Sequence, residues 1–257
     1  MPAPSPNILL VGSDNPTTWV IYNHLISEFG LFSALIEEPT SKRILLRNRY
    51  RKLGWSNVLG QIAFVALVRP VLIRLGKKRI TSILHSHAME PAAPMTAAVR
   101  HVPNINGPAA LAAIREAAPA VVIVNGTRIL KRETLKAVNA TFINTHQGIT
   151  PRYRGAHGAY WALYEGNPAQ CGVTVHVVDE GIDTGNIIAQ AVIETGPEDS
   201  FVTYPYLQTA AALPLLSKAV RDALAGKLVS KPVSGPSAVW YHPGALQYLR
   251  ARLRGVR

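Results

Sequence analysis

The chain has 257 residues, of which 48% are hydrophobic, and its 27 basic and 15 acidic residues give it a net charge of +12. This length and composition predict an ordinary buried core in one large domain, or in one domain with a small appendage. The charge is local, because residues 39–89 hold 11 basic residues and no acidic one. We therefore interpret this basic segment as a local surface that binds an anion, and we expect no nucleic acid as a partner of the protein.

The cysteine content and the apolar segments of the sequence indicate the cellular compartment of the protein. The only cysteine, Cys171, excludes an internal disulfide and a Cys-based zinc cluster within one chain, so we expect a reducing compartment. The N-terminal residues lack a signal-peptide pattern. The most apolar run, residues 62–68, stops at Arg69 and Pro70, far short of the roughly 20 residues that a spanning helix needs. The sequence predicts a cytoplasmic protein.

The first third of the chain begins like an α/β domain. "NILLVG" (residues 7–12) predicts a strand, residues 17–30 a helix and residues 32–38 a second strand. Only Gly12 stands where a dinucleotide-binding loop needs three glycines, so we expect a plain strand-to-helix turn. The basic segment 42–79 predicts two helices, and the second is too apolar for a free surface helix. It must cover the protein itself, a partner subunit or an anionic membrane surface, and the sequence leaves these open.

Strands and helices alternate in the middle of the chain. Strands are predicted at 99–102, 120–125 and 140–146, and helices at 107–119 and 132–139. This alternation predicts a mostly parallel sheet with helices on both faces, and ligands bind such sheets at the C-terminal strand ends. A helix at 156–167, an antiparallel hairpin at 172–194, a long helix at about 200–225 and a basic amphipathic tail are expected to follow.

Polar residues with catalytic chemistry stand at two places. Asn144 and His146 are two apart on a strand and so project to the same face, where an amide donor and an imidazole could serve an acyl transfer. The same pair fits a loop cap and a buried structural histidine. Asp183 lies in the turn of "VVDEGIDTGNII" (residues 177–188), where a carboxylate could orient a histidine or relay a proton. A solvated hairpin turn is the alternative.

Four motifs in order are together more specific than either site alone. "NGTRIL" (125–130), "INTH" (143–146), "PRYRGAHGAYWAL" (151–163) and "GVTVHVVDEGIDTGNIIAQ" (172–190) resemble the formyltransferases that use 10-formyltetrahydrofolate. The resemblance implies that Asn144, His146 and Asp183 are catalytic, that 10-formyltetrahydrofolate is the co-substrate and that no metal is needed. It also implies a folate site with two walls, formed by Thr127, Arg128, Ile129 and Leu130 and by Asp179, Gly181 and Ile182.

Departures from the family pattern indicate which amine receives the formyl group, the acceptor of the reaction. Gln147 and Gly148 begin a "QGITP" segment where the family has Pro-Ser and then Leu-Leu-Pro. The glycine-rich phosphate loop of glycinamide ribonucleotide formyltransferases is not matched by "GSDNPTTW", and little chain follows Gly226 for the additional domain of initiator methionyl-tRNA formyltransferases. By elimination the chain is similar to the sugar-nucleotide N-formyltransferases of surface-polysaccharide (O-antigen, lipopolysaccharide) biosynthesis.

The implied substrate is therefore the amine of a nucleotide-linked amino-deoxy sugar. Its predicted binding residues are Gln147, Gly148, Arg152, Tyr153 and Arg154. The two guanidinium groups suit a diphosphate, although solvated loop charges explain them equally well. Other amines, such as glycinamide ribonucleotide or an amino-acid derivative, are the alternative acceptors.

These expectations define an α/β, Rossmann-like domain over residues 1–195, with a basic helical insertion at about 40–80. Residues 196–257 are predicted to form a C-terminal helix and tail that pack on the same domain as a short extension. A non-catalytic membrane-surface protein on the same fold is the alternative from another class. A homodimer and peripheral contact with the inner face of the membrane are left open.

Overall fold

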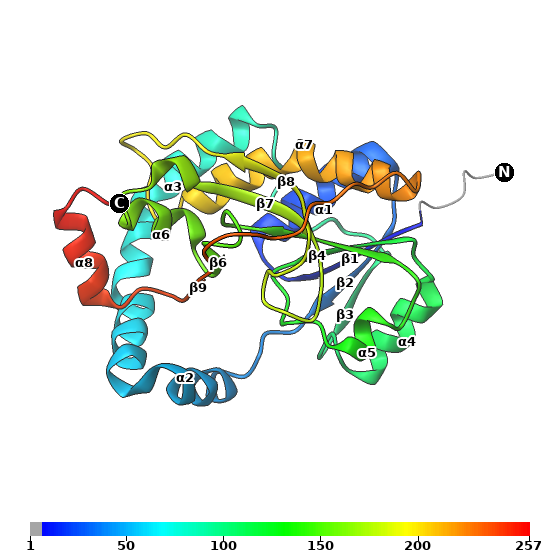
Figure 1. The fold of residues 1–257 in the computed structure, drawn as a ribbon, viewed down its shortest axis with the longest axis horizontal. Helices are drawn as coiled ribbons and strands as arrows, with labels where there is room; N and C mark the ends of the chain where they lie inside the picture. Colours follow the sequence, from blue (N-terminus) through cyan, green and yellow to red (C-terminus); the bar gives the residue numbers. More distant parts are fainter. Residues whose placement is uncertain (1–6) are drawn as a thin grey trace.

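A seven-stranded sheet forms the centre of the structure, a computed structural model that describes residues 7–257, without the side chains of 42–49 and 52–53 (Figure 1). The first five strands in spatial order are parallel, β7 is antiparallel to β5, and β8 is antiparallel to β7. The predicted fold class, with its appended hairpin, is confirmed. In spatial order the strands are β3 (Val99–Val102), β2 (Ser33–Glu37), β1 (Ile8–Ser13), β4 (Val121–Asn125), β5 (Thr141–His146), β7 (Gly172–Val177) and β8 (Ile187–Val192).

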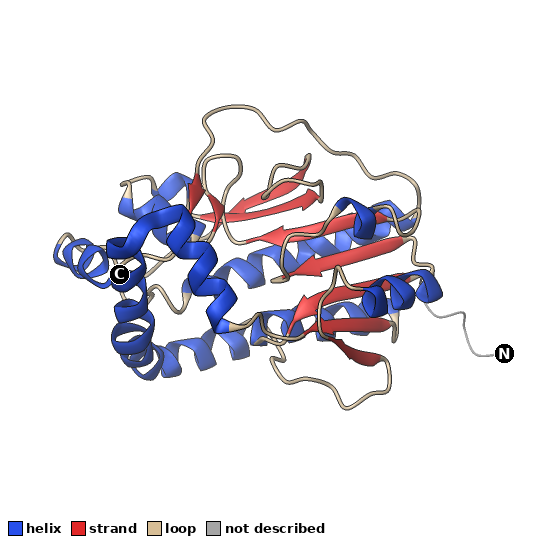
Figure 2. Cartoon of the chain, turned by 90° about the horizontal axis from the view of Figure 1, so that it is seen from below, coloured by secondary structure: helices blue, strands red, loops and turns tan. Residues whose placement is uncertain are grey.

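Helices cover both faces of this sheet, as Figure 2 shows. On β1, Ile8 and Leu10 pack in one core with α1 (Pro16–Phe29) and α7 (Tyr204–Leu224), whereas Leu9 and Val11 pack in another with α4 (Pro108–Ala117). This alternation follows from the two-residue period of a strand. Because both faces are covered, β4 is an uninterrupted buried run whose apolar residues end at Asn125.

Outside residues 42–86, the remaining helices and short strands all belong to the C-terminal half of the sequence. A two-stranded sheet joins the loop after β5 to the tail, with Arg154 opposite Val239. This pairing holds the tail across the loop that follows the predicted catalytic strand. The elements are α5 (Arg132–Leu135), β6 (Arg154–Gly155), α6 (Gly158–Tyr164), the 3-10 helix η2 (Pro168–Gln170), β9 (Val239–Trp240) and α8 (Ala245–Leu253).

A long helical arm, residues 42–86, contains the two helices expected from the basic segment, which meet at Gly54. It consists of α2 (Lys42–Ala63), a π-helical turn η1 (Phe64–Val68) and α3 (Arg69–Ser86), with a kink at Gly54. The helix does not stop at Pro70, because the preceding turn is widened: the Arg69 N–H bonds to the Phe64 carbonyl five residues back. A π turn of this kind accommodates a proline ring that would clash in a regular helix.

An aromatic core fastens the arm to the rest of the protein. Phe64 of η1 is fully buried and packs edge-on against Phe201 and Tyr248, with ring centroids 5.0 and 5.2 Å apart. Tyr160 and Trp161 of α6 belong to the same cluster. The arm is thus part of the folded body along one of its sides.

Candidate active site

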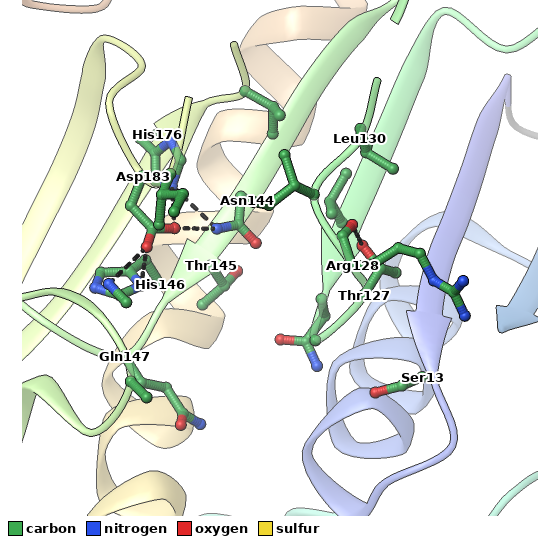
Figure 3. A pocket seen from close by; sticks show the side chains of 18 of the residues that line it. Ser13, Thr127, Arg128, Leu130, Asn144, Thr145, His146, Gln147, His176 and Asp183 are labelled. Atoms are coloured by element: carbon green, nitrogen blue, oxygen red, sulfur yellow. Dashed lines mark hydrogen bonds and ion pairs between the residues drawn. The ribbon is translucent and has the colours of Figure 1, made fainter. Parts of the chain in front are cut away.

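A cavity of about 660 Å³ opens at the C-terminal ends of β1, β4 and β5, bounded on one side by the loop after β7 (Figure 3). This is the edge at which open α/β sheets bind ligands, and the size suits a cofactor-sized molecule. Asn144, His146 and Asp183 all lie in its wall. The structure therefore brings together two segments that the sequence separates.

The β5 strand places Asn144 and His146 side by side. Phe142, two residues earlier, is buried in the core beneath α4, so the alternation of the strand sends the next two even-numbered side chains toward the same side of the sheet. There the core ends and the cavity begins. The His146 side chain is only 5% exposed.

Asp183 reaches this pair from the loop between β7 and β8. Its carboxylate Oδ2 lies 3.2 Å from His146 Nδ1 and accepts a hydrogen bond of 2.9 Å from the Gly155 N–H. Its Oδ1 lies 3.4 Å from the Asn144 amide nitrogen. The residue has a φ of +51°, which Asp tolerates better than most side chains. The same loop needs glycine at Gly185, where a Cβ would stand 1.7 Å from the Val177 carbonyl oxygen.

His146 faces hydrogen-bond acceptors through both of its ring nitrogens. Nε2 lies 2.7 Å from the Tyr153 carbonyl oxygen, and Nδ1 faces Asp183. The ring satisfies both neighbours only when both nitrogens carry a proton. Burial lowers the pKa of His146, and the Asp183 carboxylate offsets only part of that effect. The second proton is therefore weakly held, as suits a group that exchanges a proton during a reaction.

Asp183 is the stable charge of the pair. Burial by itself would raise the pKa of its carboxyl, but His146, the neighbouring His176 and the Gly155 N–H outweigh burial and lower the pKa to about 2. The carboxylate is accordingly ionised across the neutral range, while the proton on the neighbouring ring comes and goes.

His176 on β7 is a site residue that the sequence reasoning missed. Its Nε2 lies 3.0 Å from the Asn144 amide nitrogen and 3.6 Å from Asp183 Oδ1, and its Nδ1 donates to the Val177 carbonyl at 2.8 Å. In this tautomer Nε2 accepts from Asn144 and holds that amide in place. The antiparallel register sets Asn144 directly opposite His176. The only signal in the sequence was a histidine in an alternating strand just before the Asp183 turn.

The two predicted walls of the folate site face one another across the cavity. Thr127, Arg128, Ile129 and Leu130 line it after β4, and Asp179, Gly181 and Ile182 line it after β7. Glu37, which the sequence analysis did not single out, supports the first wall from the end of β2. Its 4% exposed carboxylate accepts from the Ile105 N–H at 2.8 Å and the Arg128 N–H at 3.1 Å, and it forms an ion pair with the Arg128 guanidinium.

The residues predicted to bind the acceptor are more scattered. Gln147 lines the cavity, and Gly148 lies behind it, packed against the Tyr153 carbonyl and Gly158. Tyr153 is fully buried and donates through its hydroxyl to Glu165, which also pairs with Arg152 at 3.1 Å.

Arg154 takes part in the wall of the site through another residue. Its guanidinium donates to the Ile182 carbonyl at 3.0 Å and so ties the loop after β5 to the Asp183 loop. Neither Arg152 nor Arg154 is among the residues that line the cavity. Diphosphate binding by these two side chains stays a prediction.

Comparison with known proteins places the chain in a family. The family profile described as formyl transferase matches residues 58–212, which is more than half of the chain. The chain therefore belongs to the formyl transferase family.

Relatives and solved structures agree with this assignment. The methionyl-tRNA formyltransferase of Anaeromyxobacter dehalogenans is 32% identical over 185 residues, 66% of this chain and 59% of that protein. The chain spans less than two thirds of the length of the curated relatives it matches. A sugar N-formyltransferase structure from Shewanella has a TM-score of 0.56 at 17% identity, covering 91% of this chain and 75% of that one. A sugar 3N-formyltransferase solved with dTDP and 5-N-formyl-THF has a TM-score of 0.53 at 12% identity, covering 93% and 70%.

Proposed function

We propose that the protein transfers a formyl group from 10-formyltetrahydrofolate to an amine, and that the amine belongs to a nucleotide-linked amino-deoxy sugar. One observation carries the reaction type: a carboxylate, an imidazole and an amide from two separate segments meet in the wall of a cavity at the C-terminal edge of a parallel sheet. Membership of the formyl transferase family supports the same chemistry.

The donor would lie between the two walls that face each other across the cavity. Ile129 is 51% exposed in the first wall and offers an apolar surface to a flat ring, while the backbone of Thr127 and Arg128 offers polar groups. Glu37 fixes this wall, since a buried carboxylate that accepts two backbone N–H groups leaves the loop little freedom. The bound donor would supply an activated formyl carbon.

The residues of this chain would then manage charge and protons. The neutral amine forms a C–N bond to the formyl carbon, and negative charge develops on the formyl oxygen. Asn144 and His146 would donate hydrogen bonds to it by turning an N–H away from Asp183, which lies 3.4 Å from the Asn144 amide nitrogen and 3.2 Å from His146 Nδ1. Removing one such donor typically raises a barrier by about 3 kcal/mol. The amine nitrogen must lose a proton and the departing N10 must gain one as its C–N bond breaks. His146, whose second proton is weakly held, would carry the proton from the amine to N10, while the ionised Asp183 carboxylate orients the ring.

Two sets of proteins suggest different acceptors. Sugar N-formyltransferases share the fold over 91–93% of this chain, and one of them was solved with a nucleotide and a formylated folate. Gln147 stands in the cavity wall beside His146, where it could meet an acceptor. The curated relatives, by contrast, are methionyl-tRNA formyltransferases, and the 32% identity to one of them makes methionyl-tRNA the second candidate acceptor.

A panel of amines with 10-formyltetrahydrofolate tests both levels of the proposal. We expect mass spectrometry to show formylation of a nucleotide-linked amino sugar, with glycinamide ribonucleotide and an amino-acid derivative inert. Formylation of methionyl-tRNA alone would select the second candidate. Failure with every amine offered would refute formyl transfer.

A histidine pair makes the test specific to the site. His146→Ala should abolish transfer while the thermal unfolding profile confirms a folded protein. His101→Ala removes an exposed histidine on β3, which does not line the cavity, and should leave turnover unchanged. Near wild-type turnover by the His146 variant would contradict the mechanism.

A further inference from the structure

The outer side of the arm carries an unusual amount of exposed apolar surface. The helix from Gly54 to Ser86 has a mean hydropathy of 1.8 over its most apolar 18 residues, and only 17% of those residues are buried. By length and composition alone it could cross a membrane. Such surface is expensive to leave in water and marks a place where something binds. The large exposed side chains between 55 and 75 are Trp55 (63%), Leu59 (57%), Ile62 (42%), Val65 (41%), Leu67 (70%), Val71 (55%), Ile73 (41%) and Leu75 (74%).

The opposite side of the arm is fastened to the protein body, and detaching it would break several buried contacts. Phe64 is buried among aromatic rings, and Gln61 donates to the His242 carbonyl at 2.9 Å. A Cβ on Gly76 would approach Val202 to 2.8 Å, so the helix lies directly on the body there. Further along, Arg79 forms a two-pronged ion pair with the buried Asp199. These attachments keep the helix lying along the protein, with its other side outward.

The outward side is basic as well as apolar. In α3, Val71, Arg74, Leu75 and Lys78 are spaced at i, i+3, i+4 and i+7, so they share one face, and all four are exposed. Residues 39–89 contain 11 basic side chains and no acidic one. Long basic side chains beside aliphatic ones can lay their stems on the apolar surface and place their charges at its border. The tail helix α8 packs against α2 and η1 at the same end of the molecule (Figure 1). It exposes leucines of its own.

Charge and surface chemistry together select one kind of partner. A second copy of the chain in a twofold interface would set this acid-free surface against itself, and like charges would repel. A nucleic acid would match the charge but would leave the leucine, isoleucine and valine side chains without a partner. An acidic lipid bilayer offers anionic headgroups at its surface and hydrocarbon just below.

We propose that the outward side of the arm docks the protein on an anionic membrane surface, with its apolar side chains in the headgroup and acyl boundary and its basic residues on lipid phosphates. The arm adjoins the active-site cavity by its inner side, because Gln61 holds the backbone of His242, which lines that cavity. Docking would therefore keep the cavity close to the bilayer. The proposal does not depend on which amine is formylated.

Vesicle binding by the whole chain, without substrates, tests the proposal. We expect the protein to sediment with phosphatidylcholine vesicles that contain about 30% phosphatidylglycerol, and to be released by salt or by omission of the acidic lipid. Each basic residue near such a surface contributes about fivefold in affinity, so the double substitution Arg74→Gln/Lys78→Gln should weaken binding about 25-fold. Leu67→Gln/Leu75→Gln should weaken it at least about tenfold, since two apolar anchors are lost.

Matched control variants distinguish an effect of this face of the arm from a general effect of losing charge or apolar surface. Lys136→Gln/Lys227→Gln removes two exposed basic residues elsewhere, and Val229→Gln removes a 74% exposed apolar one; both should bind like the parent protein. All variants should keep the parent unfolding temperature and formyl transfer to a soluble amine.

Three results would overturn the proposal. Equal binding to neutral and acidic vesicles by all variants is one, and an arm-dependent dimer with no vesicle binding is another. Arm-dependent binding of tRNA with no binding to vesicles is the third. Absence of formyl transfer would count only against the proposed function, since vesicle binding is read without substrates.

Discussion

Replacing Asp183 by Asn removes the stable charge of the candidate active site with little change in volume. The carboxyl has a pKa of about 2 in the folded protein against 3.8 ordinarily, a difference of nearly two units. At about 1.4 kcal/mol per unit, ionised Asp183 contributes on the order of 2 kcal/mol to stability. Because the folded pKa is the lower one, this contribution is present above about pH 4 and is lost as the pH falls toward 2.

Two assays follow from that magnitude. Urea unfolding of the parent protein at pH 6 and pH 3 should show a loss that includes about 1 kcal/mol from Asp183, since about half of its contribution is gone at pH 3. Asp183→Asn should lack this part of the pH dependence. Its kcat for formyl transfer should fall about 100- to 10,000-fold, the range of general acid–base catalysis.

Glu180→Gln provides the matched control, because Glu180 lies in the same loop, is 61% exposed and pairs with Arg132 at 3.5 Å on the surface. Its kcat and pH dependence should be those of the parent. Equal pH dependence in Asp183→Asn and the parent would show that the carboxylate is not held as the structure places it. A kcat within about threefold of the parent would refute its role in proton transfer.

Two further predictions concern residues that support the site. Glu37→Gln turns one of its two acceptor oxygens into a donor that faces a backbone N–H, so we expect a loss of about 2 kcal/mol in urea unfolding. It should also raise the KM for the formyl donor while kcat stays within about twofold; a fall in kcat at unchanged KM would contradict the role assigned to the first wall. Arg79→Met leaves Asp199, 1% exposed, without its bidentate partner and should destabilise the protein by about 3 kcal/mol. Arg79→Met/Asp199→Asn should recover part of that loss, and a single-variant effect under about 0.5 kcal/mol would mean that the arm is not anchored there.

The predicted strands and most helices could be derived from local patterns. The buried run of β4 and the Ala-rich α4 each show their type within about ten residues, and the alternation of the two fixes a parallel sheet. The helical arm was predicted as two helices, and the break between them lies at Gly54 as expected. The second helix was expected to run through Pro70, but the π turn that lets it do so is not encoded in a hydrophobic pattern.

The residues of the candidate site also fall into those that the sequence predicts and those that only the structure shows. That Asn144 and His146 share a face follows from strand geometry alone, and a family resemblance was needed to pair them with Asp183. His176 and Glu37 were missed because each acts across strands: His176 meets Asn144 through the register of an antiparallel pair, and Glu37 reaches the loop after β4 from the end of β2.

The sequence by itself determined the class of sheet, the edge at which ligands should bind and the shared face of Asn144 and His146, because all of these depend on residues close together in the chain. The tertiary structure decided where the side chains of the loop after β5 point. There the tail pairs with Arg154 and Gly155 from more than 80 residues away, Tyr153 is buried and Arg152 turns to Glu165. It also decided which side of the arm is left outward, since that depends on aromatic contacts with Phe201 and Tyr248 that no local pattern specifies.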